Sequence, residues 1–288
     1  MTPRKMLREM LARPGYRIVP GAHDTLTARL VQLAGFEAVY LTGGGFSRAS
    51  GYPDLGLLTL SEITPYIART VDALEIPVIA DMDTGYGNAL NVVRTVREYE
   101  RTGVAAFHIE DQVSPKKCGH YEGKQLVSRA EMIGKIKAAV DTRRDADMVI
   151  IARSDARAVE GLAASIDRVN AYLEAGADVG FVEAPQSAEE LAAIPPALRK
   201  PALANIFEGG KTPTLPAKTL EQMGFRIGIY PSQTQRAAIA AAKKVLAVLK
   251  RDGDTNAIEH ELATFNDRED AVNAARWREI EAKYLKDI

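Results

Sequence analysis

Short apolar segments of strand length alternate with longer segments of helical periodicity along most of the chain. The apolar segments are residues 17–20, 38–42, 78–81, 105–110, 148–153, 179–183, 202–206 and 226–230. The helical segments between them are residues 25–34, 60–74, 89–102, 128–140, 163–175, 187–194 and 215–223. This alternation is typical of strand–helix units on a parallel sheet, and eight such strands close a barrel. We therefore predict an α/β fold, a (β/α)8 TIM-type barrel over about residues 1–231.

Three of the helical segments end in a small residue, a glycine and an apolar residue, at Gly35, Gly103 and Gly176. A glycine at this place supplies the left-handed residue that turns a helix back toward the sheet. The repetition indicates copies of one supersecondary unit rather than unrelated domains.

The chain continues beyond the eighth strand as a helical extension over about residues 232–288. Helical patterns cover residues 233–250, 257–264 and 268–284, with a break at Gly253. These are more helices than a barrel needs. The extension is either a capping layer or an interface for another subunit, and we treat residues 1–288 as a single domain.

The charge balance and the single cysteine exclude several classes of protein. With 37 basic and 38 acidic residues among 288, no net field favours nucleic acid or an anionic membrane. One cysteine cannot form an internal disulfide. The N-terminus lacks an apolar core of signal-peptide length, and no apolar run reaches the roughly 18 residues of a membrane span. We expect a cytoplasmic protein.

Polar residues gather where the predicted strands end. They are Thr42, Gly43, Gly44, Asp81, Asp83, His108, Glu110, Asp111, Arg153, Glu183 and Asn205, with Arg236 after the last strand. In barrels of this type the catalytic groups lie at the carboxyl ends of the strands. We expect these side chains to form one site.

The acids among them predict a divalent metal site. Asp81 and Asp83 lie two apart at a strand end, and Glu110 ends the next strand. Mg²⁺ takes one or two carboxylates directly and keeps several waters, so a cluster of acids suits Mg²⁺, with Mn²⁺ as an alternative. Asp54 could reach the metal through water, or serve only in a turn. The alternative for Asp81 and Asp83 is that they cap the following helix.

Anion-binding groups stand beside the acids. The glycines at 43–45 offer backbone N–H groups without a Cβ in the way, although a triple glycine is also a common turn. Arg153 and Arg236 could hold a carboxylate bidentately. Their alternative is ion pairing with Glu183 or Asp155.

The only cysteine, Cys118, has Lys116, Lys117, Gly119 and His120 as its neighbours. A free cysteine is most often a small buried hydrophobe. These neighbours instead predict an exposed, flexible loop in which positive charge lowers the pKa of the thiol toward neutrality. Such a group can give or take a proton during a reaction.

These segments resemble the isocitrate lyase and phosphoenolpyruvate mutase superfamily, within the branch of short lyases that cleave 2,3-dimethylmalate or 2-methylisocitrate. The similarity extends from about Val19 to Arg236. Its strongest element is the segment Lys-Lys-Cys-Gly-His at residues 116–120, and residues 40–45, 81–87 and 108–112 support it.

The resemblance implies a barrel whose final helix is swapped between subunits, a homotetramer, and a cysteine loop that closes over the site. It places Mg²⁺ on Asp83 directly and on Asp54, Asp81 and Glu110 mostly through water. It also implies that pyruvate or glyoxylate is held by Thr42, Gly43, Gly44 and Arg153. The second product would lie toward Cys118, Gly119, His120, Glu183, Asn205 and Arg236.

The resulting hypothesis is a retro-aldol cleavage of a substituted 2-hydroxy dicarboxylate to pyruvate and a carboxylic acid. Cys118 protonates the carbanionic carbon, His120 belongs to the donors around it, and Tyr40 is a candidate base. One departure from the 2-methylisocitrate lyases is Phe207, where those enzymes carry a hydroxyl residue. It removes a hydrogen-bond donor and favours a smaller or more methylated dicarboxylate.

The sequence leaves other activities open. Within the same superfamily they are an oxaloacetate hydrolase or decarboxylase and a phosphonate mutase. From another class, the chain could be an inactive metabolite-binding protein.

Overall fold

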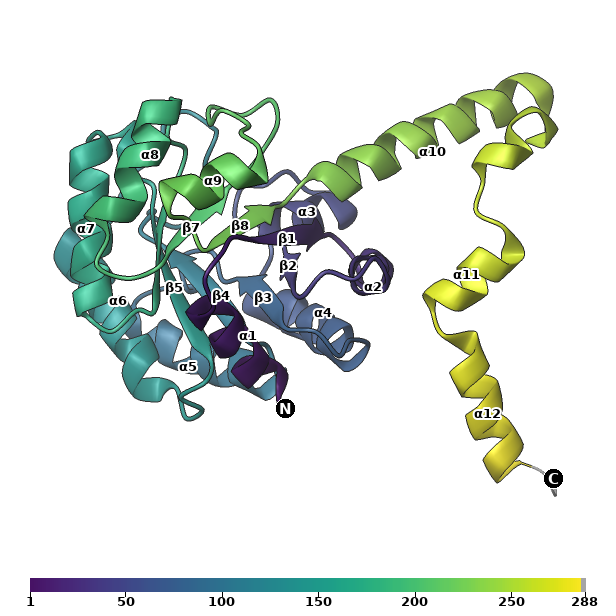
Figure 1. Ribbon diagram of the computed structural model, residues 1–288, viewed down its shortest axis with the longest axis horizontal. Coiled ribbons are helices and arrows are strands. Elements are labelled where there is room, and N and C mark those ends of the chain that lie inside the picture. Colours follow the sequence, from purple (N-terminus) through teal and green to yellow (C-terminus); the bar gives the residue numbers. More distant parts are fainter. Residues whose placement is uncertain (286–288) are drawn as a thin grey trace. The chain divides into compact units, whose positions relative to one another are not determined.

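Eight parallel strands form a closed barrel in the computed structural model of the protein, which describes residues 1–285 (Figure 1). The strands are β1 (Arg17–Ala22), β2 (Val39–Leu41), β3 (Val78–Asp81), β4 (Ala106–Glu110), β5 (Val149–Ser154), β6 (Val179–Val182), β7 (Ala202–Asn205) and β8 (Ile227–Tyr230). Each pairs with the next, and β8 pairs with β1. The predicted barrel is therefore confirmed.

The register between neighbouring strands brings the polar residues together. Asp81 of β3 lies opposite His108 of β4, and Glu110 of β4 lies opposite Arg153 of β5. Because all the strands run in one direction, their carboxyl ends share one rim of the barrel. Residues far apart in the sequence thus become neighbours there.

The seven helical segments predicted between the strands are all present on the outside of the barrel (Figure 1). They are α2 (Thr25–Leu33), α4 (Leu60–Asp72), α5 (Ala89–Arg101), α6 (Arg129–Thr142), α7 (Leu162–Glu174), α8 (Ala188–Ala197) and α9 (Ala217–Met223). A short 3-10 helix, η1 (Ala156–Ala158), precedes α7. The turns after α2, α5 and α7 contain Gly35, Gly103 and Gly176 with φ of 83°, 83° and 117°, as predicted.

Two further helices were not predicted. Helix α1 (Pro3–Ala12) inserts Leu7 and Met10 among the apolar residues inside the barrel. Helix α3 (Gly43–Ala49) begins with the three glycines, which have poor helix propensity. The side chain of Thr42 accepts a hydrogen bond from the backbone N–H of Gly45 and so caps this helix.

The core has two parts. Inside the barrel, Val19, Ile79, Val149, Phe181 and Leu203 are almost completely buried. A second cluster lies between the strands and the surrounding helices. Both faces of the sheet are therefore covered, which is why the strands are continuous apolar runs rather than alternating ones.

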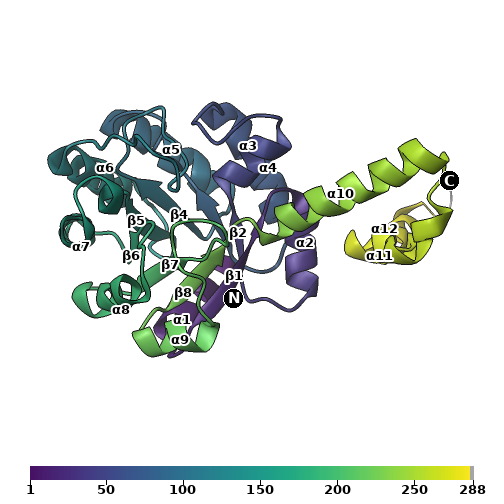
Figure 2. The ribbon, with the colours of Figure 1, turned by 90° about the horizontal axis from the view of Figure 1, so that it is seen from above.

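The described residues from 234 onward, up to 285, form a second compact unit. Helix α10 (Gln233–Asp252) leads into it, followed by η2 (Asn256–Glu261), α11 (Phe265–Ala271) and α12 (Ala274–Tyr284) (Figure 2). The single helix predicted over residues 268–284 is wrong, because Asn273 takes a left-handed conformation with φ of 54° and separates α11 from α12. Residues 257–264, predicted as one helix, instead contain the 3-10 helix η2 and a non-helical segment that ends at Thr264, the N-cap of α11.

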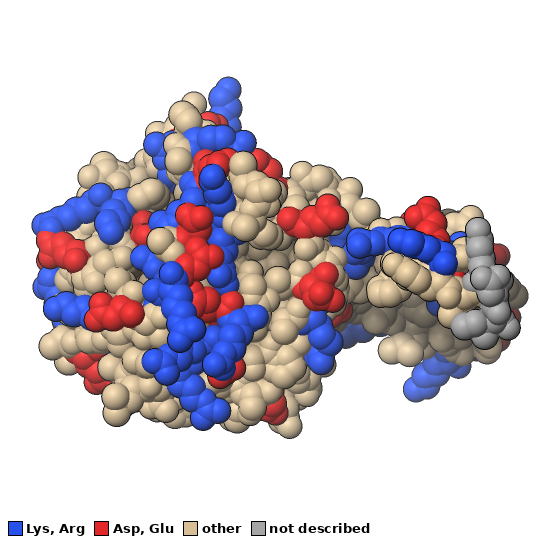
Figure 3. Space-filling view, turned by 90° about the horizontal axis from the view of Figure 1, so that it is seen from below, with Lys and Arg blue, Asp and Glu red and all other residues tan. Residues whose placement is uncertain are grey.

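The surface carries mixed charge. On the face drawn in Figure 3, basic and acidic side chains are interspersed, which agrees with the balanced composition. Over residues 1–285, none of the helices has the length and apolar character needed to cross a membrane.

Candidate active site

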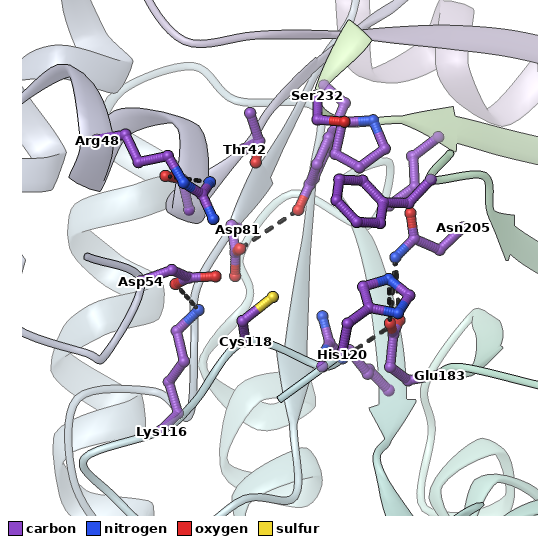
Figure 4. A pocket seen from close by; sticks show the side chains of 17 residues that line it. Thr42, Arg48, Asp54, Asp81, Lys116, Cys118, His120, Glu183, Asn205 and Ser232 are labelled. Carbon is purple, nitrogen blue, oxygen red and sulfur yellow. Dashed lines mark hydrogen bonds and ion pairs between the residues drawn. The ribbon is translucent and has the colours of Figure 1, made fainter. Parts of the chain in front are cut away.

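A pocket of about 580 Å³, including space open to solvent, lies at the carboxyl ends of the strands. The predicted site residues that line it are Tyr40, Thr42, Gly44, Asp54, Asp81, Cys118, Gly119, His120, Arg153, Glu183 and Asn205 (Figure 4). Arg48, Lys116, Phe207, Ile229, Pro231 and Ser232 complete the lining. The strand ends thus bring most of the predicted residues together.

Gly43, Asp83 and Glu110 are absent from this lining but contact residues in it. The backbone N–H of Gly43 donates to Asp81 Oδ2 at 3.2 Å. Asp83 Oδ1 lies 3.0 Å from Lys116 Nζ, and Glu110 Oε2 lies 3.2 Å from Arg153 Nε. These residues form a layer directly behind the pocket wall.

Arg236 belongs to the C-terminal unit, near the start of α10. The residues lining the pocket all precede it in the sequence. Its assignment to the substrate site stays a prediction.

The acid cluster, which consists of Asp54, Asp81, Asp83 and Glu110, is largely buried. The pKa values of Asp81 and Asp83 differ. Asp81 accepts hydrogen bonds from the backbone N–H of Asp83 at 2.9 Å and from Tyr40 Oη at 3.3 Å. Burial raises the pKa of Asp81, but the electrostatic effects of His108, Lys116 and Arg153 outweigh burial and bring the pKa to about 2. Burial, together with Asp81 and Asp54, raises the pKa of Asp83 to about 6. Asp81 is therefore the more acidic of the two.

Lys116 lies between two of the acids. Its side chain is 6% exposed, and Nζ is 2.6 Å from Asp54 Oδ1 and 3.0 Å from Asp83 Oδ1. Burial alone lowers the pKa of Lys116, but Asp83, Asp54 and Glu110 raise it well above the ordinary value. The positive charge of Lys116 thus lies beside the acids, at a position that would also suit a metal cation.

Glu110 is the acid of this cluster whose carboxylate receives the least stabilisation from hydrogen bonds. It is fully buried, and neither carboxylate oxygen accepts a hydrogen bond from any part of the described chain. Burial raises its pKa well above the ordinary value despite the charge of Arg153. Within residues 1–285, no group of three acidic, histidine or cysteine side chains lies close enough together to hold one metal ion without water. A cation here would therefore use one or two carboxylates directly and water for the others.

Tyr40 and His108 form a buried pair beside Asp81. Tyr40 Oη lies 2.8 Å from Nε2 of His108, and their rings are stacked at 5.7 Å. Burial lowers the pKa of His108 to about 4, so its imidazole is neutral at physiological pH. Burial and Asp81 raise the pKa of Tyr40 well above its ordinary value. A tyrosinate is thus unfavourable, which argues against Tyr40 as the base and for Tyr40 as a hydrogen-bond donor.

The segment that carries Cys118 packs across the pocket. The backbone N–H of Cys118 donates to the carbonyl of Asp54 at 3.2 Å, and the Gln112 side chain bonds both backbone groups of Lys117. Lys124 donates to the carbonyls of Gly119 and Tyr121. The expectation of an exposed loop is therefore wrong at Lys116 and Gly119, which are buried, while Lys117, Cys118 and His120 are half-buried.

The thiol of Cys118 points into the pocket, between Asp54 and Asp81 on one side and His120 on the other (Figure 4). Burial raises the pKa of Cys118 above its ordinary value, and Asp54 adds to this effect. The predicted lowering is wrong because Lys116 is neutralised by the acids, while Lys117 donates to the carbonyl of Gly123 instead. The group is a protonated thiol at neutral pH.

His120, Glu183 and Asn205 form the opposite wall. Asn205 Nδ2 donates to both oxygens of Glu183 at 3.2 Å, and His120 Nε2 lies 3.6 Å from Glu183 Oε1. The ring of His120 stacks on Phe207 at 4.8 Å, and its Nδ1 accepts from the backbone N–H of Lys211. Burial lowers the pKa of His120 although Glu183 opposes it. This wall therefore combines one acid with neutral donors and an aromatic face.

Arg153 is one of the cations that line the pocket. Its Nε and Nη2 donate to the two oxygens of Asp155 at 2.9 and 3.1 Å, so the predicted alternative of ion pairing with Asp155 is confirmed. Gly119 lies directly above it, where an added Cβ would come within 2.6 Å of Arg153 Nη2 and of Glu183 Oε1. A side chain at position 119 would therefore have to displace Arg153 or Glu183.

Asp111 supports this arrangement from outside the pocket. It is fully buried and accepts hydrogen bonds from Ser154 Oγ at 2.7 Å, from Tyr172 Oη at 2.9 Å and from the backbone N–H of Asp155 at 2.9 Å. Asp111 therefore fixes the segment that holds Arg153.

Sequence reasoning missed the roles of Arg48, Lys116 and Ser232 in the pocket lining. Arg48 lies one helical turn after Gly44 in α3, so the signal was hidden when the glycines were interpreted as a turn. Lys116 was considered only as a neighbour of the thiol. Ser232 follows β8 at the same rim as the other polar residues, and that position was the available signal.

Comparison with known proteins gives consistent results. A family model described as phosphoenolpyruvate phosphomutase matches residues 7–250. A 2,3-dimethylmalate lyase of Eubacterium barkeri is 46% identical over 279 residues, covering 96% of each chain. A 2-methylisocitrate lyase of Aeropyrum pernix is 44% identical, covering 91% of this chain and 84% of the relative.

Solved structures show the same fold. A crystal structure of 2,3-dimethylmalate lyase superposes with a TM-score of 0.93 at 38% identity, covering 98% of this chain and 95% of that one. An oxaloacetate acetylhydrolase with the inhibitor 3,3-difluorooxalacetate also gives 0.93, at 36% identity and 98% and 97% coverage. A phosphonopyruvate hydrolase with oxalate and Mg²⁺ gives 0.90, at 32% identity and 99% and 100% coverage.

Proposed function

Because the chain belongs to the phosphoenolpyruvate mutase and isocitrate lyase superfamily, in its short lyase branch, we propose the following reaction for its pocket. The protein is a carbon–carbon lyase, and it cleaves a substituted 2-hydroxy dicarboxylate to pyruvate and a carboxylic acid. The observation that carries this assignment is the Cys118 thiol, which stands in one pocket with the acid cluster on one side and the wall of His120 on the other.

Mg²⁺ is the proposed cofactor. The fit is supported by the hard oxygen donors of Asp54, Asp81, Asp83 and Glu110 and by the two oxygens of the buried Glu110, neither of which accepts a hydrogen bond within residues 1–285. Asp83 is proposed as the direct ligand and the other three as ligands through water. When bound, Mg²⁺ supplies Lewis-acid polarisation of the substrate's hydroxyl and adjacent carboxylate.

Cys118 is the proposed general acid. The hydroxyl proton of the substrate leaves to a base, the carbon–carbon bonding pair moves onto the carbon beside the second carboxylate, and the thiol returns a proton to that carbon. The raised pKa of Cys118 favours this role, because the thiol is protonated before the bond breaks. Tyr40 would donate a hydrogen bond toward the reacting oxygen, since its own pKa is raised.

The wall of His120, Glu183 and Asn205 is proposed to hold the half of the substrate that becomes the carboxylic acid, while Arg153, with Thr42, Gly43 and Gly44, is proposed to hold the pyruvate half. As charge builds on the carboxylate of the acid half, neutral donors stabilise it without needing to reorganise. Gly119 allows the chain to pass close above Arg153.

Phe207 restricts the range of substrates that we propose. Its ring lines the pocket and stacks on His120, so this corner presents an apolar surface where a third carboxylate would need donors. Burying a carboxylate there without partners would be costly. We therefore favour a 2,3-dimethylmalate-like diacid over a 2-methylisocitrate-like triacid.

The decisive experiment is a panel of substituted malates with Mg²⁺, in which pyruvate release is read with a coupled lactate dehydrogenase. Cleavage of a methylated malate, faster than of 2-methylisocitrate, is the expected result. The likeness to an oxaloacetate acetylhydrolase makes oxaloacetate a necessary member of the panel, with oxalate and acetate as products. Binding of the malates without any product would instead indicate an inactive metabolite-binding protein.

We also propose that the chain is a cytoplasmic homotetramer in which the final helix is swapped between subunits. The support within the C-terminal unit is its exposed apolar side chains, among them Leu246, Phe265 and Trp277, which are 64%, 67% and 68% exposed. Mass measurement in solution at several protein concentrations tests the oligomeric state.

A further inference from the structure

The strong cations that line the pocket differ in whether an acid already neutralises them. They are Arg48, Lys116 and Arg153. Lys116 is paired with Asp54 and Asp83. Arg153 is paired with three acids: Asp155 at 2.9 Å, Glu110 at 3.2 Å and Glu183 at 3.9 Å. Neither of these two offers an uncompensated positive charge to a ligand.

Arg48 differs from both. Its guanidinium points from α3 toward the pocket, beside Asp54 and Thr42 (Figure 4). Nη1 donates to the carbonyl of Gly44 at 2.9 Å, and no carboxylate of residues 1–285 lies within the 4.0 Å of an ion pair. One N–H is thus used to orient the group, while the charge remains unpaired.

We propose that Arg48 binds the carboxylate of the 2-oxo acid half of the substrate. The inference rests on the proposed function. Arg48 lies in α3, the helix that Thr42 caps and that contains Gly44, and both residues are assigned to that half together with Gly43 and Arg153. A guanidinium presents several donors in a fixed plane and suits a carboxylate better than an ammonium does.

The position of Arg48 also distinguishes it from Arg153. Arg153 lies between the two walls, 3.2 Å from Glu110 and 3.9 Å from Glu183, whereas Arg48 lies on the side of the acid cluster, beside Asp54. Arg48 also has an ordinary structural role. It lies in the last turn of the short helix α3, where a cation interacts favourably with the helix dipole.

The test is isothermal titration of the full-length protein with Mg²⁺ and, separately, with pyruvate and with propionate as probes of the two halves. The variants are Arg48→Gln and Arg48→Lys, with Arg97→Gln, an exposed arginine of α5, as matched control. We expect Arg48→Gln to weaken pyruvate binding about tenfold and Arg48→Lys to weaken it less, with propionate binding unchanged. Arg97→Gln should leave both affinities unchanged.

Two results would overturn the assignment while leaving the proposed function intact. The first is unchanged pyruvate affinity in Arg48→Gln when the wild-type protein binds pyruvate. The second is a larger loss for propionate than for pyruvate, which would place Arg48 on the other half. If Arg48→Gln does not fold, Arg48→Lys decides, because it keeps the charge at the end of α3 but loses the planar fork. Failure of the wild-type protein to bind pyruvate or to release it from any malate would refute the proposed function itself.

Discussion

Replacement of Cys118 by serine tests the proposed chemistry most directly. The side chain is nearly the same size, and its backbone N–H still donates to the Asp54 carbonyl, so the loop should keep its place. What changes is the acidity of the group that faces the reacting carbon. Substrate and Mg²⁺ should still bind, while the protonation step loses its acid.

The size of the effect follows from the state of the thiol. With the ordinary pKa of 9.0, about 3% of the thiol would be ionised at pH 7.5, and burial raises the pKa further. The wild-type group is therefore almost wholly in the acid form. General acids contribute roughly 10²- to 10⁴-fold to rate, so we expect Cys118→Ser to lower kcat by about that factor.

The assay is pyruvate release with the best substrate of the malate panel, together with titration of pyruvate and Mg²⁺ into the variant. A fall in kcat with unchanged binding supports the acid role. Near-normal turnover in Cys118→Ser would refute it, and loss of binding together with turnover would show that the thiol acts through the loop instead.

Three other predictions use different features of the pocket. The rate of Cys118 alkylation by iodoacetamide should rise with pH through a midpoint above that of an ordinary thiol, because burial raises its pKa; full reactivity at pH 7.5 would contradict this. Gly119→Ala should reduce activity strongly, because the new Cβ comes within 2.6 Å of Arg153 Nη2. The control variant Gly134→Ala adds a Cβ with nothing within 4 Å and should keep full activity. This control should also stabilise α6 by about 0.5–1 kcal/mol, measured by thermal or denaturant unfolding. Phe207→Thr should improve kcat/KM for 2-methylisocitrate relative to 2,3-dimethylmalate, and an unchanged ratio would remove Phe207 from substrate selection.

Local sequence patterns accounted for most of the barrel. The eight strands and the seven helices between them were predicted because apolar periodicity reflects which faces are covered. The turn glycines, such as Gly35, were predicted because a positive φ favours glycine. Asp81 and Arg153 reached the same pocket because parallel strands share one rim.

The helices that were missed or misplaced depend on contacts outside their own segment. Helix α1 is stabilised by burial of Leu7 inside the barrel, and α3 by the cap from Thr42 despite its glycines. The break at Asn273 between α11 and α12 follows from one backbone conformation rather than from a change in periodicity.

The amino-acid order by itself determined the topology, the rim at which the chemistry gathers and most residues of the site. The tertiary structure decided which charges neutralise one another: Lys116 pairs with Asp54, 62 positions away, whereas Arg48 forms no ion pair with an acid among residues 1–285. It also decided the direction in which the pKa of Cys118 moves. The adjacent lysines in the sequence suggest a thiolate. The pKa of the thiol, however, depends on its burial and on its distances to charged side chains, and these are defined only once the chain has folded.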